Sequence, residues 1–423
     1  MPTDWRRETI AGVTTFLTMS YIIVVNPSIL ATSGTGLSFR AVMTATVLLS
    51  ASMTALMGLF ARLPFAVAPG MGLNAFFTYQ IVLKQKVPAP VALGLVVWAG
   101  VAFVVVSATP LREAIARAVP HHLRVAAAAG IGLLLSFIGL RQAGILVADP
   151  VTFVTAGHLG RPALLFGFGL LLTLLLLLRA SPIALMAGIV LTTGLAWLCG
   201  EVRAPAQLLS LPDLSLVGAA DLVHALRLAY VPALLAILLT DLFDSLSTFV
   251  GVAHATGLVD EQGQPRNLGR ALLTDALATL GAGLLGTSAG TAYIESVAGI
   301  RAGGRTGLTA LVCALCFLPF LFLGPLAAVV PPSATAPALL LVGVFMFRTV
   351  ADLPMERLEE ALPAYVTLLL IPLTSSIAQG ILWGFGLHAL AFALAGRARE
   401  LRAGMWVLAA VAAFALGIEN LRR

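Results

Sequence analysis

TDLFDSLSTFVG (residues 240–251) and GAGLLGTSAGTAYIESVAGI (residues 281–300) are very apolar stretches that nevertheless carry ionisable side chains. Four acidic residues lie in the apolar parts of the segment from 240 to 300, with no basic residue next to them: Asp241, Asp244, Asp275 and Glu295. A charged side chain at membrane depth costs about 2.5–3.5 kcal/mol on insertion scales. These carboxylates are therefore candidates for a binding or ion-transfer site inside a membrane.

The composition identifies an integral membrane protein. Of the 423 residues, 59% are hydrophobic and only 10% are charged, whereas a soluble domain has about 25% charged residues. The net charge of +6 comes almost entirely from arginine and forms no basic domain, which argues against nucleic acid as a partner. The N-terminal MPTDWRRETIAGVTTFLTMSYIIVVNP lacks a small-residue cleavage site and continues into a full span. The three cysteines form neither a disulfide framework nor a metal-ligand set.

About 20 apolar residues are needed for a helix that crosses the hydrocarbon core. This criterion predicts about 14 transmembrane helices, some of them short, and a further C-terminal apolar segment: 10–30, 41–61, 72–84, 88–109, 123–140, 162–178, 182–200, 230–253, 268–285, 291–301, 305–328, 335–350, 361–374, 377–396, and then 403–419. The last segment either crosses the membrane or lies along its surface. If the N-terminus faces the cytoplasm, the cytoplasmic loops contain more arginine and lysine than the external loops. This bias fits the positive-inside rule and predicts a multi-pass protein of the inner (plasma) membrane with a cytoplasmic N-terminus. The polar stretch 201–229 is predicted to form an external strand and an interfacial helix.

Two of the predicted helices, 72–84 and 291–301, are too short to cross alone. The Gly- and Pro-rich LPFAVAPGMG precedes the first and the Gly- and Ser-rich LLGTSAG precedes the second, so each is predicted to begin with a short extended strand. Seven spans precede 230–253, and because seven is odd, a second set of seven starts from the opposite side. Interrupted short segments at matching positions indicate inverted repeats around a midplane binding site. The predicted fold is an all-α, polytopic 7+7 inverted-repeat transporter fold with two short strands before its two half-helices.

The helix 230–253 carries two of the acids on one face. Asp241, Asp244 and Thr248 are at positions i, i+3 and i+7. The functional interpretation is a carboxylate pair that faces a cavity, one member binding substrate and the other coupling a cation. Like charges this close disfavour double ionisation, which suits a proton-carrying group. The alternative is that one aspartate only caps or pairs structurally.

Glu295 lies near the start of the second half-helix, where free backbone N–H groups are available. A carboxylate beside N–H donors suits a neutral planar ligand that has both donor and acceptor edges. Asn74 offers a matching amide in the first half-helix, and Phe76 either stacks on a ring or packs in the core.

Thr15 is either a pocket residue or bonded to its own helix backbone. Asp275 is either a structural partner for a core hydroxyl or part of a proton route.

The chain has no Walker loop, HExxH or GxSxG motif. The DxxD formed by Asp241 and Asp244 is similar to one motif of membrane prenyltransferases, but those enzymes need a second acidic motif, and the first seven predicted spans contain no acid.

The stretches GVTTFLTMSYIIVVNP, APGMGLNAFF, DLFDSLSTFVGVA and GTSAGTAYIESVAGIRAGGRTGLTA resemble the signature stretches of AzgA-like purine permeases, a branch of the nucleobase–ascorbate transporter superfamily. The resemblance runs nearly end to end. It implies the 7+7 fold, with a core domain formed by 1–110 and 230–330 and a gate domain formed by 111–229 and 331–423. It also implies proton-coupled uptake of hypoxanthine, guanine or adenine, with no cofactor, by a homodimer in the lipid bilayer.

The resemblance also implies roles for individual residues. The AEHIGHL motif of the superfamily's uracil permeases aligns with FDSLSTF, so Asp244 falls on their substrate-binding glutamate and Thr248 on a histidine. Ile294 and Glu295 fall on the binding pair of the second half-helix, and Asn74 lies near a phenylalanine of the first. The branch usually has DLFDTxGT where this chain has DLFDSLST, so Ser245 and Ser247 are departures, and loss of the glycine is expected to narrow the approach to this helix.

The sequence therefore predicts a secondary active purine importer that works by elevator-type movement of the core domain against the gate domain. The expected substrate-binding residues are Asp244, Glu295, Asn74, Thr248, Ile294, Thr15 and Phe76, and Asp241 and Asp275 are the expected proton-coupling residues. The alternatives are a uracil or xanthine transporter, a sulfate-type anion transporter of the same architecture, a metal-dependent membrane enzyme and a passive channel. The acids count against an anion carrier.

Overall fold

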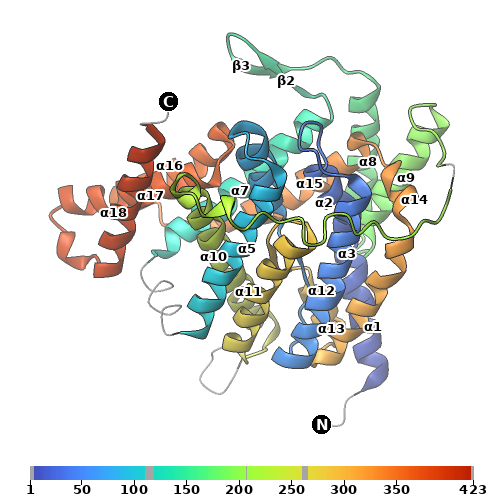
Figure 1. Ribbon diagram of the computed structural model, residues 1–423, viewed down its shortest axis with the longest axis horizontal. Coiled ribbons are helices and arrows are strands. Elements are labelled where there is room, and N and C mark those ends of the chain that lie inside the picture. The colour runs from blue at the N-terminus through green and yellow to red at the C-terminus, as the bar shows by residue number, and fades with distance from the viewer. Residues whose placement is uncertain (1–3, 110–118, 206, 260–264, 421–423) are drawn as a thin grey trace.

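Helices dominate the computed structural model, which describes residues 4–109, 119–205, 207–259 and 265–420 (Figure 1). Within this described part, nine helices are long and apolar enough to cross a membrane, and shorter apolar helices lie between them. The predicted polytopic all-α class is therefore confirmed.

The elements follow one another in two comparable series. The first series is α1 (Trp5–Met19), α2 (Ile22–Leu30), α3 (Phe39–Leu56), η1 (Met57–Ala61), β1 (Val67–Pro69), α4 (Met71–Ala75), η2 (Phe76–Lys84), α5 (Ala89–Ala108), α7 (His121–Gln142), β2 (Leu146–Asp149), β3 (Phe153–Ala156), α8 (Arg161–Leu178) and α9 (Ala184–Leu198). The second is η3 (His224–Leu226), η4 (Leu228–Tyr230), α10 (Val231–Thr256), α11 (Leu268–Leu285), β4 (Gly290–Ala292), α12 (Ser296–Arg301), α13 (Gly307–Phe317), η5 (Leu318–Phe322), α14 (Gly324–Ala328), α15 (Pro332–Phe347), η6 (Arg348–Asp352), α16 (Leu358–Thr374), α17 (Ile377–Leu394), η7 (Ala398–Glu400) and α18 (Ala403–Asn420).

Strands β1 and β4, which precede the two half-helices, pair with each other in antiparallel register, with Ala68 opposite Thr291. Buried side chains satisfy much of the backbone around this pair: the Thr54 hydroxyl bonds both the N–H and the carbonyl of Val67, and the Tyr293 hydroxyl donates to the Pro69 carbonyl at 2.5 Å. Non-helical backbone at membrane depth is tolerated only where such partners are present. The two predicted strands are thus confirmed, and their pairing joins the two repeats at the centre of the protein.

The helices pack as two sets, and each set combines elements of both repeats. In one set, α5 packs against α11, α1 against α12 and α13, and α3 against α2, α11 and α13. In the other, α7 packs against α15 and α16, α8 against α9 and α15, and α17 against α16 and α18. Fewer contacts join the two sets, among them α2 with α15, α4 with α7 and α10 with α17.

One acidic residue contradicts the prediction that the first spans are free of acids. Helix α1 begins at Trp5, five residues earlier than predicted, because Asp4 caps it by accepting from two backbone N–H groups. Glu8 therefore lies within the helix and is buried, only 4% exposed. Its carboxylate accepts from the N–H groups of Arg305 and Thr306 at 3.1 and 3.2 Å and from the Thr309 hydroxyl, so that it satisfies free donors at the start of α13.

The polar segment 201–229 also differs from its prediction. It crosses the front of the molecule as an extended chain (Figure 1) and, apart from position 206, contains turns and 3-10 helix in place of the predicted strand and interfacial helix. The N–H of Asp221 donates to the Pro90 carbonyl at 2.8 Å, which fixes the segment to α5. Asp221 accepts hydrogen bonds from the backbone N–H of His224 and, with a smaller effect, from its ring. These bonds hold the pKa of Asp221 below its ordinary value.

The hairpin β2–β3, which projects at the top of Figure 1, was not predicted.

Candidate functional site

Helix α10 and the β4–α12 connection meet at a small cavity of about 80 Å³. Asp244 and Thr248 come from α10, and Ile294 and Glu295 come from the connection. These four predicted site residues are therefore brought together. The remaining lining residues are Tyr21, Met71, Gly72, Thr291, Ala292, Tyr293, Val342 and Met346.

Glu295 is held in place by the first repeat. Its Oε1 accepts a hydrogen bond from the Tyr21 hydroxyl at 2.7 Å, and its backbone carbonyl accepts from the Thr18 hydroxyl at 3.4 Å. Its backbone also forms the N-cap position of α12. The carboxylate therefore has one oxygen bonded to tyrosine and one that can accept a further hydrogen bond from a ligand.

Tyr21 is a functional candidate that the sequence analysis missed. It lies between α1 and α2, where the first span is broken, and is 274 residues from its partner Glu295. Its position inside the apolar stretch GVTTFLTMSYIIVVNP was the available signal, since the hydroxyl of a buried tyrosine usually needs a hydrogen-bond partner. Met71, Val342 and Met346 were missed as well, because nothing distinguishes an apolar cavity wall from ordinary core in the sequence.

Asp241 lies on the same helix but faces away from the cavity, fully buried against α11. Its Oδ2 contacts the Thr279 hydroxyl, which also lies 2.9 Å from the Gly290 carbonyl oxygen. A hydroxyl has one proton to donate and a carbonyl can only accept. The single Thr279 proton is therefore shared between two acceptors, and a protonated Asp241 would satisfy both contacts by donating to Thr279.

Asp275 on α11 is likewise fully buried. Its Oδ2 accepts from the Ser245 hydroxyl, whose oxygen lies 2.9 Å from the hydroxyl of Thr291. The other oxygen, Oδ1, has no hydrogen-bond partner within the described part of the chain.

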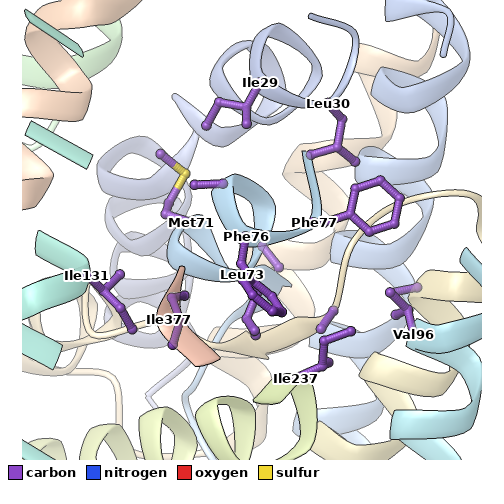
Figure 2. Close-up of a cluster of buried hydrophobic side chains, with 14 of the residues drawn as sticks. Ile29, Leu30, Met71, Leu73, Phe76, Phe77, Val96, Ile131, Ile237 and Ile377 are labelled. Atoms are coloured by element: carbon purple, nitrogen blue, oxygen red, sulfur yellow. The ribbon is translucent and has the colours of Figure 1, made fainter. Parts of the chain in front are cut away.

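Three predicted binding residues do not line this cavity. Asn74 is fully buried, and its Oδ1 accepts from the Ser288 hydroxyl of the opposite repeat. Phe76 packs close to Leu73 in a hydrophobic cluster (Figure 2). Thr15 donates to the Ala11 carbonyl of its own helix at 3.0 Å.

Ser247, where the related permeases have glycine, is exposed and is not among the cavity residues. The expectation that its side chain narrows the approach to α10 therefore stays a prediction. Ser245, the other departure, keeps the hydroxyl that reaches Asp275.

A second cavity, of about 880 Å³, separates the two helix sets at the end where the connection to the β2–β3 hairpin begins. Residues of α2, η2 and α14 line one side and residues of α7, α15 and α16 the other. The Lys84 ammonium donates across it to the Thr374 carbonyl at 2.9 Å. Among the described residues, no group of three or more His, Cys, Asp or Glu side chains is arranged to hold a metal ion.

The sequence matches the Xan_ur_permease profile, described as a permease family, over residues 6–382. It is 39% identical over 401 residues to the adenine permease AdeP of Escherichia coli, which covers 94% of this chain and 90% of that protein. It is 40% identical over 412 residues to the guanine/hypoxanthine permease PbuO of Bacillus subtilis, with 94% of each chain covered.

Solved structures share the fold at lower identity. The transmembrane domain of the cyanobacterial bicarbonate transporter BicA superposes with a TM-score of 0.69 at 19% identity, covering 89% of this chain and 98% of that domain. The structure of SLC26A9 gives a TM-score of 0.66 at 11% identity, with 92% of this chain and 65% of that chain covered. These similarities confirm the predicted 7+7 architecture.

Proposed function

This chain belongs to the permease family, and from that premise we propose that it is a secondary active importer of purine nucleobases. Members of the family are transporters, not enzymes. The observation that carries the purine proposal is the pair of carboxylates, Asp244 and Glu295, that share one small cavity with polar and apolar walls. The named relatives AdeP and PbuO, which take adenine and guanine or hypoxanthine, support the same substrate class.

The cavity suits a neutral heterocycle. Asp244 and the Glu295 carboxylate accept ring N–H groups, and the Thr248 hydroxyl bonds ring acceptors or donors. Met71 and Val342 supply apolar surface for the ring faces. A site with few polar groups on apolar walls is typical for a small ligand.

We further propose that transport is coupled to protons and that the core domain (1–110 with 230–330) moves as an elevator against the gate domain (111–229 with 331–423). Asp241 and Asp275 are the candidate proton carriers, since each is buried, contacts a hydroxyl and has no hydrogen bond to a basic side chain within the described part of the chain. Val342 and Met346 come from α15 of the second helix set, so movement between the sets would open or close the cavity.

We also propose that the protein is a homodimer. Chemical cross-linking in the native membrane tests this proposal.

Uptake into proteoliposomes tests the proposed function. Purified protein is assayed with radiolabelled hypoxanthine, guanine, adenine, uracil and sulfate, with and without an imposed pH gradient. The proposal predicts accumulation of at least one purine and stimulation by external acid. Uptake of uracil or sulfate in preference to every purine would contradict the substrate class, and uptake that ignores both the gradient and an uncoupler would indicate a passive channel.

Tyr21→Phe is expected to weaken purine binding while leaving the protein folded. The substitution removes the donor to Glu295, and hydrogen bonds to charged groups contribute about 1.5–3 kcal/mol, which corresponds to a loss of about tenfold or more in apparent affinity. Concentration-dependent uptake measures KM. The matched control is Tyr365→Phe, at an exposed position of α16, which should not change KM. Equal KM values for the two variants would show that Tyr21 does not position Glu295.

We propose that the N-terminus is cytoplasmic, so that the 880 Å³ cavity opens to the outside. In a Cys199→Ser background, Ser33→Cys in this cavity is expected to react with a membrane-impermeant maleimide in intact cells. Ala395→Cys, just after α17, should react only after permeabilisation. The reverse labelling pattern would mean that the N-terminus lies outside.

A further inference from the structure

Two hydroxyl groups connect the cavity with the buried carboxylate of α11. Thr291 lines the cavity beside Asp244, and its side chain interacts with that carboxylate. The Thr291 hydroxyl lies 2.9 Å from the Ser245 hydroxyl, which in turn contacts Asp275 Oδ2. Ser245 and Asp275 are fully buried and Thr291 is 3% exposed, so the protein encloses this path.

The number of protons along this path is fixed by its chemistry. Each hydroxyl has one proton and can accept another. When Ser245 donates to Asp275, it must accept from Thr291, and Thr291 then accepts from a protonated Asp244. When Asp275 is protonated, all these bonds reverse and Asp244 becomes the ionised acceptor. One proton therefore satisfies the whole path, at either end.

We propose that Thr291 and Ser245 relay one proton between Asp244 and Asp275, so that Asp275 stores the coupling proton while Asp244 accepts a purine N–H. The Asp244 O–H bond breaks as its proton bonds to Thr291. Thr291 passes its own proton to Ser245, and Ser245 passes its own to Asp275 Oδ2. No hydroxyl is left charged. This inference rests on the proposed function and identifies how its site would couple substrate to proton.

The relay links binding to protonation in a definite direction. A purine N–H bonds well to an ionised Asp244 and poorly to a protonated one. Substrate therefore favours the state in which the proton is on Asp275, where Oδ1 has no partner within the described part of the chain. Proton and substrate then move together inside the same helix set.

The other titratable groups near the path do not offer an equivalent route. Glu295 lies in the cavity, but its oxygen Oε1 is held by Tyr21. The Tyr293 hydroxyl donates to the Pro69 carbonyl. Asp241 contacts Thr279, whose other neighbour is the Gly290 carbonyl oxygen, and a carbonyl has no proton to pass on. Asp241 is thus placed to hold a proton, whereas Asp275 is placed to exchange one with the cavity.

The test separates proton coupling from substrate exchange in the full-length protein. Proteoliposomes are assayed for hypoxanthine accumulation driven by an imposed pH gradient, and for counterflow of labelled against unlabelled hypoxanthine without a gradient. Counterflow requires only the loaded carrier, whereas accumulation requires the proton to be loaded and released. Ser245→Ala is expected to lose about tenfold or more of the gradient-driven rate, since positioned proton transfer contributes at least that much, while it keeps most of its counterflow. Ser245→Thr, which retains the hydroxyl, should keep both.

A Ser245→Ala protein that responds to the gradient like wild type would overturn the relay. So would a proportional loss of accumulation and counterflow, because that result would assign Ser245 a structural role only. If Ser245→Ala does not fold, Thr291→Val is compared with Thr291→Ser, and an equal ratio of accumulation to counterflow in these two variants would also overturn it. Absence of counterflow in the wild type for every purine would instead contradict the proposed function itself.

Discussion

Glu295→Gln is expected to lower purine accumulation by about 10- to 100-fold, which corresponds to the loss of one hydrogen bond to a charged group and its replacement by a mismatched donor. The amide oxygen of glutamine can still accept from Tyr21, so the hydrogen bond at 2.7 Å is retained. The NH₂ group then occupies the position of the carboxylate oxygen that would accept a ring N–H. Two donors facing each other repel, and in a water-poor cavity neither finds a replacement partner.

The measurement is gradient-driven uptake of radiolabelled hypoxanthine, guanine and adenine, corrected for the amount of protein in the membrane. Glu201→Gln is the matched control, because Glu201 is in an exposed pair with Arg161 at 3.2 Å and surface pairs contribute little. Normal accumulation against a gradient by Glu295→Gln would show that Glu295 does not bind the substrate.

Gly307→Ala is expected to destabilise the protein clearly, because it adds a methyl group where two helices contact each other backbone to backbone. A Cβ at position 307 would lie 1.9 Å from the Gly58 carbonyl oxygen, and a Cβ at Gly58 would lie 2.4 Å from the Gly307 carbonyl oxygen. Both neighbours are backbone atoms, so η1 and α13 must separate to admit the methyl group. Overpacking of a well-packed interface typically costs about 1–3 kcal/mol, and small residues are what allow membrane helices to approach this closely.

Thermal unfolding of detergent-purified protein measures this effect as a lower midpoint and a smaller fraction that survives heating on size-exclusion chromatography. Gly167→Ala is the matched control, since the same substitution in α8 would meet nothing within 4 Å. The two variants should differ clearly. Identical midpoints would mean that the contact between η1 and α13 adjusts without cost.

The half-helices illustrate what local sequence can predict. LPFAVAPGMG and LLGTSAG contain residues that disfavour continuous helix, and the strands Val67–Pro69 and Gly290–Ala292 form within or directly after them. The odd number of preceding spans also sets the two repeats in opposite directions, which agrees with the antiparallel register of the strands, but only the structure shows that the strands pair with each other. Local patterns were sufficient here because breaking a helix depends on the backbone preferences of a few adjacent residues.

The site shows where this reasoning stops. Spacing along α10 correctly indicated that Asp244 and Thr248 share a face, and both line the cavity with Glu295. The same spacing grouped Asp241 with them, yet its carboxylate contacts Thr279 of α11. Residues three or seven positions apart lie on the same broad side of a helix. The neighbouring helices determine which of these residues border a cavity and which are packed against another helix.

Sequence alone thus determined that this is a polytopic membrane protein, that two helices are interrupted near its centre and that unneutralised acids gather in the second repeat. These features depend on composition, chain direction and nearest neighbours. Tertiary structure decided that Glu8 satisfies the start of α13, that Tyr21 holds Glu295, and that Ser245 lies between Thr291 and Asp275. The physical reason is that a buried hydrogen bond requires two groups to meet within about 3 Å. When those groups are far apart along the chain, only the packing of the helices brings them together.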